Sequence, residues 1–396
     1  MMEKATHHQT KDHNSRLVLQ TIFDAGVISR AEIARQTGLT RPTVSALVAG
    51  LIESDIVIET GSGPSAGGKP PTLVAVNGAG RSLLTLDLSG GNFQGAVVNL
   101  RGDIVRRVSL PAAGLKGESA LDCAGALIDT LLPQAGGSQA TLGLGVATPG
   151  LVDPHHGIVL RAVNLDWANL PLRDVLAKRY GLPVYIANDS HMAALAEFTY
   201  GVARTGGNLI AVRVGQGTGA GVILDGRPFY GDGFGAGEIG HVVVDPAGAL
   251  CSCGNRGCLE TTSSIPAILR AASAADRQQS ILAGIEALTW PRFVAAVQAH
   301  DPVAVDVAVR AGCHLGAAVA HLVGAYNIQT IVLAGPIVDL GDVLLDAVTA
   351  EMHQRVLPAM AATTTVRYAS LSEEQATDII ILGCSALVLQ RELGLA

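Results

Sequence analysis

One histidine and three cysteines lie close together in a glycine-rich stretch. His241 is followed by a short run that carries Cys251, Cys253 and Cys258. Three thiolates and one imidazole make a complete tetrahedral ligand set for a closed, structural zinc site. The glycines between them allow so short a loop to fold around one ion. The alternative is three buried free thiols that are neighbours by chance, but such cysteines have no reason to alternate with glycine beside a histidine. The spacing therefore predicts structural zinc.

Carboxylates and an amide stand where a ligand could meet them. Glu238 and Glu260 flank the zinc run, and Asn188 and Asp189 directly follow the apolar segment Val184–Ala187. Ligands of open α/β folds gather outside the carboxyl ends of the strands, so these side chains are candidates for ligand binding. Asn188 could instead be a turn residue, and Asp189 the N-cap of the helix expected over residues 192–200.

The composition describes a well-buried globular protein. A chain of 396 residues with 48% apolar and 15% charged residues suggests two or three packed domains. The polar start, Met1–Lys4, lacks the apolar segment of a secretory signal. No apolar run reaches membrane-spanning length, which argues against a membrane anchor, and the remaining cysteines indicate no disulfide framework, so we expect a cytoplasmic protein.

The charge is divided unevenly along the chain. The net charge is −7, but acids and bases balance up to Gly80, so the rest carries all of the excess. An acidic body would be repelled by phosphate. Any contact with nucleic acid must therefore be made by the N-terminal segment.

The N-terminal segment has the pattern of a helix-turn-helix. Apolar spacing predicts a helix over Asn14–Ala25. Ser29, with Glu32 three residues later, predicts a capping box that opens a second helix through Thr37.

A third helix follows after a tight turn. Gly38 permits the turn, Thr40 is the expected N-cap and Pro42 lies in the first helical turn. The expected small core consists of Ala34, Leu39, Val44, Leu47 and Leu51. The residues left to reach base edges in a major groove are Arg41, Thr43, Ser45 and Ala46.

Two short strands complete a winged arrangement. They are predicted over Ile56–Ile58 and Leu73–Val76, joined by the flexible loop 61–71, in which Lys69 is a candidate for a backbone or minor-groove contact. A three-helix module for protein contact is the alternative. The turn spacing, the caps and the wing together favour double-stranded DNA.

From Leu83 the pattern changes to that of an α/β body. Apolar segments predict strands over Leu83–Leu88, Ala96–Leu100, Leu142–Ala147, Val184–Ala187 and Ile210–Val214. The last of these runs into the glycine-rich segment Gly215–Gly221. Its glycines allow close approach of the backbone to a ligand or a neighbouring element.

These motifs together resemble the ROK family (repressors, open reading frames and kinases), over nearly the whole chain. The matching motifs are Ala147-Thr148-Pro149-Gly150, Asn164-Leu165-Asp166-Trp167, Asn188-Asp189, Glu238-Ile239-Gly240-His241 and the run Cys251–Glu260. The resemblance implies an actin-like (sugar kinase/ribonuclease H-like) two-lobed α/β body after a winged helix-turn-helix. The implied division is a DNA-binding domain (1–78), a first lobe (81–189 plus 379–396) and a second lobe with the zinc motif (190–378).

The resemblance also assigns roles to residues. It implies zinc on His241, Cys251, Cys253 and Cys258. It implies sugar hydroxyls bound by Asn164, Asn188, Asp189, Glu238, His241 and Glu260. Carboxylates and amides suit this task, because they form paired hydrogen bonds with vicinal hydroxyls.

In the family's kinases Asp189 would be the general base, but the nucleotide motifs depart from the kinase pattern. The first hairpin reads Asp87-Leu88-Ser89-Gly90-Gly91, where the kinases have Asp-x-Gly-Gly-Thr, and the later nucleotide loop reads Ala334-Gly335-Pro336. Proline removes an N–H and fixes φ, both unfavourable in a phosphate-binding turn. A base without a nucleotide cradle does not make a kinase.

The leading hypothesis is a sugar-responsive regulator, a repressor, whose kinase-derived domain binds a sugar or amino sugar without phosphorylating it. We expect it to bind operator DNA as a homodimer or homotetramer. The first alternative is an ATP-dependent kinase of glucose or an N-acetyl-hexosamine with a DNA-binding head. The second is a DNA-binding protein with a vestigial cleft that responds to a partner protein.

Overall fold

The computed structural model describes residues 7–64, 70–201, 207–371 and 378–395. The chain divides into two compact units. The first comprises residues 1–188 and 384–396, and the second comprises residues 189–383. The chain therefore passes from the first unit to the second after Asn188 and returns after Gly383.

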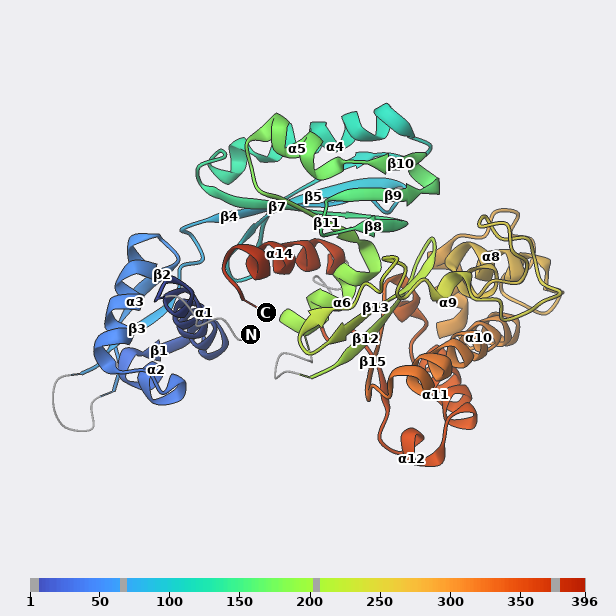
Figure 1. The fold of residues 1–396 in the computed structure, drawn as a ribbon. Coiled ribbons are helices and arrows are strands. Elements are labelled where there is room, and N and C mark those ends of the chain that lie inside the picture. Colours follow the sequence, from blue (N-terminus) through green and yellow to red (C-terminus); the bar gives the residue numbers. More distant parts are fainter. Residues whose placement is uncertain (1–6, 65–69, 202–206, 372–377, 396) are drawn as a thin grey trace. The chain divides into compact units, whose positions relative to one another are not determined.

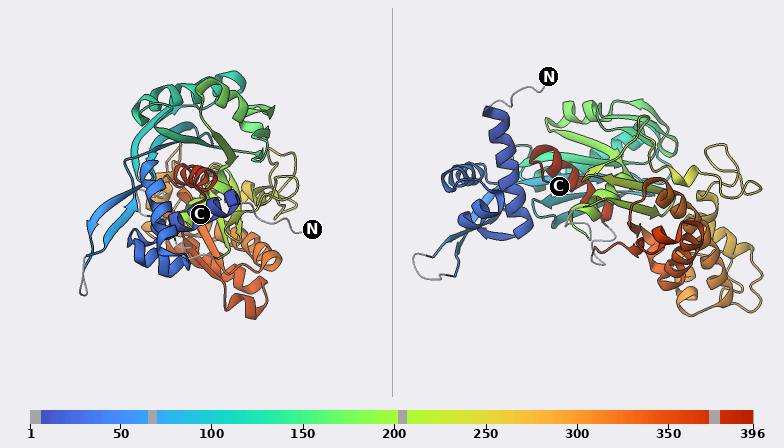
Figure 2. Two further views of the ribbon diagram at one scale, coloured as in Figure 1. Left: turned by 60° about the vertical axis from the view of Figure 1, so that its left-hand side comes forward. Right: turned by 60° about the horizontal axis from the view of Figure 1, so that its bottom comes forward.

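The first unit begins with a three-helix domain that carries a small sheet (Figure 1). Its elements are α1 (His7–Ala25), β1 (Val27–Ser29), α2 (Arg30–Thr37), α3 (Arg41–Glu53), β2 (Val57–Ser62) and β3 (Thr72–Val76). The strands pair antiparallel in the order β1-β3-β2, and the β2–β3 hairpin extends beyond the helices (Figure 2). This is a winged helix-turn-helix.

The caps explain where α2 and α3 begin. Ser29 Oγ accepts the N–H of Glu32 at 3.2 Å, and Thr40 Oγ1 accepts the N–H of Thr43 at 3.3 Å. Both predicted N-caps are confirmed. Of the predicted capping box, the bond from the Glu32 N–H to Ser29 Oγ forms, whereas the Glu32 carboxylate bonds to Arg35 and Gln36 on its own helix.

The remainder of the first unit is built on a five-stranded sheet in the order β11-β7-β4-β5-β6. Its strands are β4 (Ser82–Asp87), β5 (Asn92–Asn99), β6 (Ile104–Pro111), β7 (Thr141–Thr148) and β11 (Val184–Asn188). The helices that accompany this sheet are α4 (Gly117–Leu131), α5 (Leu172–Tyr180) and the C-terminal part of α14 (Ile379–Glu392). A separate three-stranded sheet consists of β8 (Leu151–Asp153), β9 (Ile158–Ala162) and β10 (Trp167–Leu170).

Alternation along β7 places different residues on its two faces. Leu144 and Val146 join the core that includes residues of α4 and α5. Gly143 and Gly145 face α14, and a β-carbon at Gly145 would lie 2.4 Å from the Cys384 carbonyl oxygen. Glycine at these positions lets α14 lie directly on the strand, across the sheet from α4 and α5 (Figure 1).

The second unit contains a second five-stranded sheet, in the order β14-β13-β12-β15-β16. Its strands are β12 (Leu209–Val214), β13 (Thr218–Leu224), β14 (Arg227–Pro228), β15 (Thr330–Ala334) and β16 (Thr365–Tyr368). Its helices are α6 (Asp189–Thr199), α7 (Glu260–Ser263), α8 (Ile265–Ala274), α9 (Trp290–Gln298), α10 (Pro302–Tyr326), α11 (Asp342–Arg355) and α12 (Pro358–Ala361).

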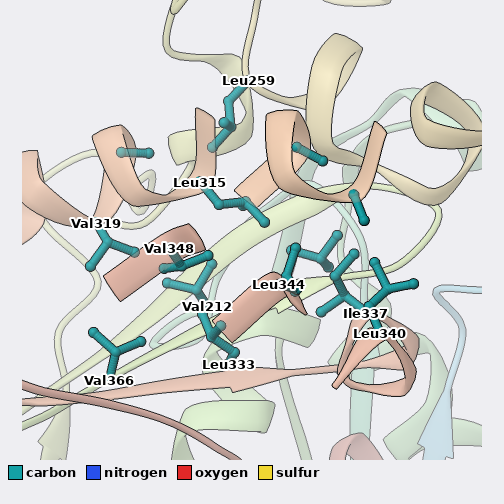
Figure 3. Close-up of a cluster of buried hydrophobic side chains, with 14 of the residues drawn as sticks. Val212, Leu259, Leu315, Val319, Leu333, Ile337, Leu340, Leu344, Val348 and Val366 are labelled. Atoms are coloured by element: carbon teal, nitrogen blue, oxygen red, sulfur yellow. The ribbon is translucent and has the colours of Figure 1, made fainter. Parts of the chain in front are cut away.

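Side chains alternate across this sheet as well. Val212 and Leu333 enter the larger core, where they meet residues of α10 and α11 such as Leu315 and Leu344 (Figure 3). Ala211 and Val332 lie on the opposite face with residues of α6. The two faces of one sheet thus hold α6 on one side and the larger helical layer on the other.

Helix α10 corrects the expectation that no segment reaches membrane-spanning length. It has 25 residues and is long and apolar enough to span by length and composition, but 56% of its most apolar window is buried inside the structure. It packs against α7, α8, α9 and α11. Those contacts make it the central helix of a core.

Candidate functional site

The four predicted metal ligands come together in the second unit. One ligand atom each from His241, Cys251, Cys253 and Cys258 lies within 4.8 Å of all the others. His241 ends the short helix η3 (Ile239–His241), and the cysteines occupy the loop after it. These residues could hold one metal ion.

The separations inside this cluster suit a tetrahedral site. His241 Nδ1 lies 3.6 Å from Cys251 Sγ, and Cys253 Sγ lies 3.6 Å from Cys258 Sγ. With metal–sulfur distances near 2.3 Å, neighbouring corners of a tetrahedron are about 3.5–3.8 Å apart. The donor set therefore fits an ion that prefers sulfur and nitrogen ligands.

The thiols differ in how readily they ionise. Burial raises the pKa of Cys258 to about 12, whereas a hydrogen bond from the Asn255 backbone lowers the pKa of the exposed Cys253. A cysteine that binds a metal ion must do so as a thiolate. A bound divalent cation would supply the charge that keeps the buried Cys258 deprotonated.

A glycine closes the cysteine loop. Gly257 has a φ of 67°, and a β-carbon there would lie 1.4 Å from the Asp245 carbonyl oxygen. No side chain fits in that space, so the position requires glycine. The loop can then turn back and bring Cys258 toward His241.

Glu238 lies next to the cluster on the far side of the imidazole. Its Oε2 is 3.9 Å from His241 Nε2, while Nδ1 of that ring faces Cys251. Burial raises the pKa of the Glu238 carboxyl; His241 opposes the rise, and the charges of Asp189 and Glu260 add to it. The charges of two other carboxylates of this unit therefore act on Glu238.

Glu260 connects the cysteine run to the glycine-rich segment. It is the first residue of α7, and its Oε2 accepts the N–H of Thr218 at 3.1 Å. Gly217 lies against the same oxygen, since a β-carbon there would be 2.7 Å away. The β12–β13 turn and α7 are therefore held together through this carboxylate.

Helix α6 begins at Asp189 and not near Met192, where the sequence predicted its start. The Asp189 side chain is buried. Its Oδ1 accepts the N–H of Ser190, and its Oδ2 accepts Arg213 Nη1 at 2.9 Å. The glycines of β13 explain its location. A β-carbon at Gly219 would lie 2.4 Å from Ser190 Oγ, so glycine lets the start of α6 lie on the strand.

Arg213 is a site residue that sequence reasoning missed. It stands in the apolar segment Ile210–Val214, at the carboxyl end of a strand, which is a place where charge is unusual. That was the available signal. Its partner Asp189 belongs to a different element, so the pair becomes visible only in the fold.

His191 holds the loop that leads to Glu238. Its Nε2 donates to the Ala236 carbonyl oxygen at 3.0 Å, and its ring meets Tyr230 edge to face at 4.9 Å. Burial lowers the pKa of His191 to about 4. A neutral imidazole inside the unit thus ties the start of α6 to the backbone two residues before Glu238.

This histidine predicts a loss of stability in acid. An unfolded histidine titrates near pH 6.5, and His191 in the fold near pH 4, so between these values the unfolded state binds more protons. The free energy of unfolding should fall as the pH drops from about 6.5 to 4, by up to roughly 3 kcal/mol. In urea unfolding at a series of pH values, His191→Phe should flatten this slope, whereas replacing the exposed His353 with asparagine should not. An unaltered slope in His191→Phe would refute the assignment.

The two asparagines predicted to bind sugar belong to the first unit. Asn164 is exposed on the short helix η2 (Val163–Leu165). Asn188 ends β11 and its Nδ2 donates to the Gly150 carbonyl oxygen at 2.9 Å, so it links two of the quoted motifs. Asp189, Glu238, His241 and Glu260 belong to the second unit.

The positions that depart from the kinase pattern have local explanations. Ser89 donates both its N–H and its hydroxyl to Asp87 Oδ1, at 2.9 Å and 2.6 Å, so Asp87 closes its own turn. In the second unit, Pro336 opens the short helix η4 (Pro336–Leu340) after Gly335, whose φ is 85°. Proline supplies no N–H at that helix start.

In the head, the predicted DNA-reading residues lie at the start of α3. Arg41, Ser45 and Ala46 are exposed, Thr43 is half-buried, and the opposite side of the helix buries Val44, Leu47, Val48 and Leu51. Ile33 joins this core, while the predicted core members Ala34 and Leu39 are only half-buried. Lys69 lies outside the described residues.

Two family patterns match the chain. The one described as ROK family matches residues 83–391, and the one described as winged helix-turn-helix DNA-binding matches residues 11–58. Together they cover both the body and the head.

Similar proteins include regulators and kinases. A xylose repressor of Caldicellulosiruptor bescii is 31% identical over 396 residues, which is 98% of each chain. A glucokinase of Halalkalibacterium halodurans is 32% identical over 318 residues, covering 78% of this chain and 94% of its own. The crystal structure of a ROK family transcriptional regulator, a homologue of the Escherichia coli Mlc protein, covers 97% of this chain and 99% of its own, with 27% identity and a TM-score of 0.80.

Proposed function

Because the chain belongs to the ROK family, we propose that it is a sugar-responsive transcriptional repressor that carries its own DNA-binding head. The observation that carries this proposal is the similarity to a xylose repressor, which extends over the head as well as the body. We assign residues 1–78 to DNA binding and residues 81–189 with 379–396, and 190–378, to the two lobes of the body.

The partner of the head is double-stranded operator DNA. The start of α3 presents Arg41, Ser45 and Ala46 to solvent with Thr43 beside them, which suits insertion into a major groove. The N-cap Thr40 and the buried face of α3 keep that surface rigid. Lys69, in the wing, is proposed as a backbone or minor-groove contact.

Arg41→Ala should weaken operator binding. A guanidinium that reads a base edge contributes roughly 1–3 kcal/mol, so the dissociation constant should rise roughly 5- to 150-fold. Fluorescence anisotropy with an operator selected from random duplexes measures this, and Arg270→Ala, an exposed cation on α8, is the matched charge control. Equal affinities of Arg41→Ala and the control would show that Arg41 does not contact the operator.

The body binds a sugar or amino sugar. The proposed ligands are Asn164, Asn188, Asp189, Glu238, His241 and Glu260. Carboxylates and amides accept and donate paired hydrogen bonds to vicinal hydroxyls, and a buried acceptor left unpaired penalises the wrong sugar. Two observations support this role: Asp189 is buried, and the charges of Asp189 and Glu260 act on the Glu238 carboxyl.

The metal is structural zinc, held by His241, Cys251, Cys253 and Cys258. Four protein ligands leave no open position for substrate, so such an ion acts as a scaffold. With Nδ1 of His241 on the metal, its Nε2 would remain directed toward Glu238. The ion would thereby fix the orientation of the residues expected to meet the sugar.

We propose that the chain does not phosphorylate its sugar. Ser89 and Pro336 both depart from a phosphate-binding turn, and Asp189 is already paired with Arg213. The similarity to a glucokinase favours a second candidate, a sugar kinase with a DNA-binding head. An ATP-coupled assay with glucose, N-acetylglucosamine and N-acetylmannosamine distinguishes them, since turnover above background would establish the kinase.

Regulation requires that sugar binding changes the affinity of the head for operator DNA. In a cytoplasmic homodimer, two heads must match half-sites at a fixed helical separation. A sugar that alters the body can change the spacing of the heads. A coupling of roughly 1–3 kcal/mol would give a 5- to 150-fold response.

Titration of the bound operator with sugars tests the proposed function. Xylose, glucose and N-acetylglucosamine are added to the protein–operator complex while anisotropy is recorded. We expect one of them to shift the operator affinity. An operator affinity that no pentose, hexose or amino sugar alters, with protein that melts cooperatively, would count against a sugar sensor.

A further inference from the structure

Arg213 places a cation inside the second unit, next to the carboxylates of the proposed effector site. Its side chain is 17% exposed and that of its partner Asp189 is 11% exposed. The two are joined by a hydrogen-bonded ion pair of 2.9 Å between Nη1 and Oδ2. A charge that is largely removed from water is retained where a partner balances it, so this pair is a built feature of the site.

The guanidinium lies where two strands end. β12 and β15 run parallel, with Arg213 opposite Ala334. A β-carbon on Gly215 would lie 3.8 Å from Arg213 Nη2 and 3.8 Å from Pro336 Cδ. The side chain is therefore confined between the turn after β12, the turn after β15 and the start of α6.

The pair sets the state of the carboxylate. Asp189 Oδ1 is occupied by the Ser190 N–H, and Oδ2 by Arg213. An ionised carboxylate has about four acceptor positions, so it can still accept from a ligand hydroxyl. Its orientation, however, is fixed by two donors from the protein.

The charges around this pair favour a neutral ligand. The charges of Asp189 and Glu260 both act on the Glu238 carboxyl. One arginine balances one of these carboxylates. Because the charge of Arg213 is already balanced by Asp189, the pair offers no net positive charge to a sugar acid or a sugar phosphate, whereas the Asp189 carboxylate can accept from a hydroxyl group.

We propose that Arg213 is a positioning and specificity residue of the effector site: it fixes the Asp189 carboxylate as an acceptor for a hydroxyl of a neutral sugar. This inference rests on the proposed function, and it adds a residue and a ligand class to it. Arg213 acts through Asp189, and its fork geometry matters because a lysine would supply the charge without the planar donors.

A double-mutant cycle on sugar affinity tests this role. Isothermal titration with xylose and glucose is run on wild type, Arg213→Met, Asp189→Asn, the double variant and Arg213→Lys. We expect Arg213→Met to weaken binding of the sugar at least tenfold. The sugar affinity of Arg213→Lys should lie between those of wild type and Arg213→Met. The double variant should bind no more weakly than Asp189→Asn, because the two residues act as one unit. Thermal unfolding of all five proteins shows whether each of them is folded.

Several results would overturn the inference. One is Arg213→Met binding within twofold of wild type, and another is a double variant whose loss is the product of the single losses. Wild type that binds glucuronate or glucose 6-phosphate more tightly than the neutral sugars would show Arg213 to be an anion partner. If Arg213→Met does not fold, Arg213→Lys and the charge-free double variant still decide the matter. Wild type that binds no sugar overturns the proposed function together with this inference.

Discussion

Replacing Cys258 with serine is expected to abolish zinc binding and, with it, the response to sugar. Cys258 is buried and lies 3.6 Å from Cys253, and serine removes one of four soft ligands from the set. The free energy of binding a structural metal is also free energy of folding. A loss of a few kcal/mol corresponds to a melting point roughly 10 °C lower for a unit of this size. Elemental analysis of purified protein, together with thermal unfolding, measures both effects.

A matched cysteine provides the control for this experiment. Cys313 lies on α10 in the same unit and is half-buried, away from the cluster. Cys313→Ser should keep one zinc per chain and keep the sugar response. Cys258→Ser that retains stoichiometric zinc would remove these four residues from consideration as a metal centre.

Glu238→Ala is expected to eliminate the sugar response while the protein still binds its operator. The Glu238 carboxylate lies 3.9 Å from His241 Nε2, and the charges of Asp189 and Glu260 act on it. A carboxylate that accepts from two vicinal hydroxyls makes two charge-assisted bonds, which are the strong kind. Their loss should weaken sugar binding roughly a hundredfold or more. Calorimetric titration with sugar measures this, and anisotropy with the operator alone should be unchanged.

The exposed Glu286 offers the control, because Glu286→Ala removes the same charge from the same unit. That variant should bind sugar as wild type does. Sugar affinity that is equal in Glu238→Ala and Glu286→Ala would exclude Glu238 from the effector site.

Much of the fold could be predicted because its signals are local. Ser29 and Thr40 mark the starts of their helices, because each accepts a hydrogen bond from the backbone N–H three residues later. Gly38 has a φ of 70°, which its position after α2 requires. Strands β7, β11 and β12 follow their apolar segments closely. The His241 and cysteine spacing likewise pointed to one cluster, because a single loop carries the cysteines.

What could not be predicted depends on partners far along the chain. Strand β1 has three residues and exists through pairing with β3. The first turns of α1, from His7, carry no apolar stripe that would reveal them. The role of Arg213 depends on α6 lying on the glycines of β13, which no local pattern states.

The glycine-rich segment shows how one pattern has two readings before a fold is known. Gly219 and Gly221 could have approached a ligand or another element. In the fold they meet Ser190, and Gly221 would place a β-carbon 2.3 Å from its carbonyl oxygen. Close packing of a helix on a strand therefore accounts for these glycines.

The most direct test of the whole account is the reciprocity between sugar and operator. Sugar affinity is measured by calorimetry on free protein and on protein saturated with operator, and operator affinity is measured with and without saturating sugar. If one molecule couples the two ligands, both factors must be equal, and we expect a value in the range of roughly 5 to 150. Sugar and operator that each bind with an affinity unaffected by the other would contradict a sugar-responsive repressor.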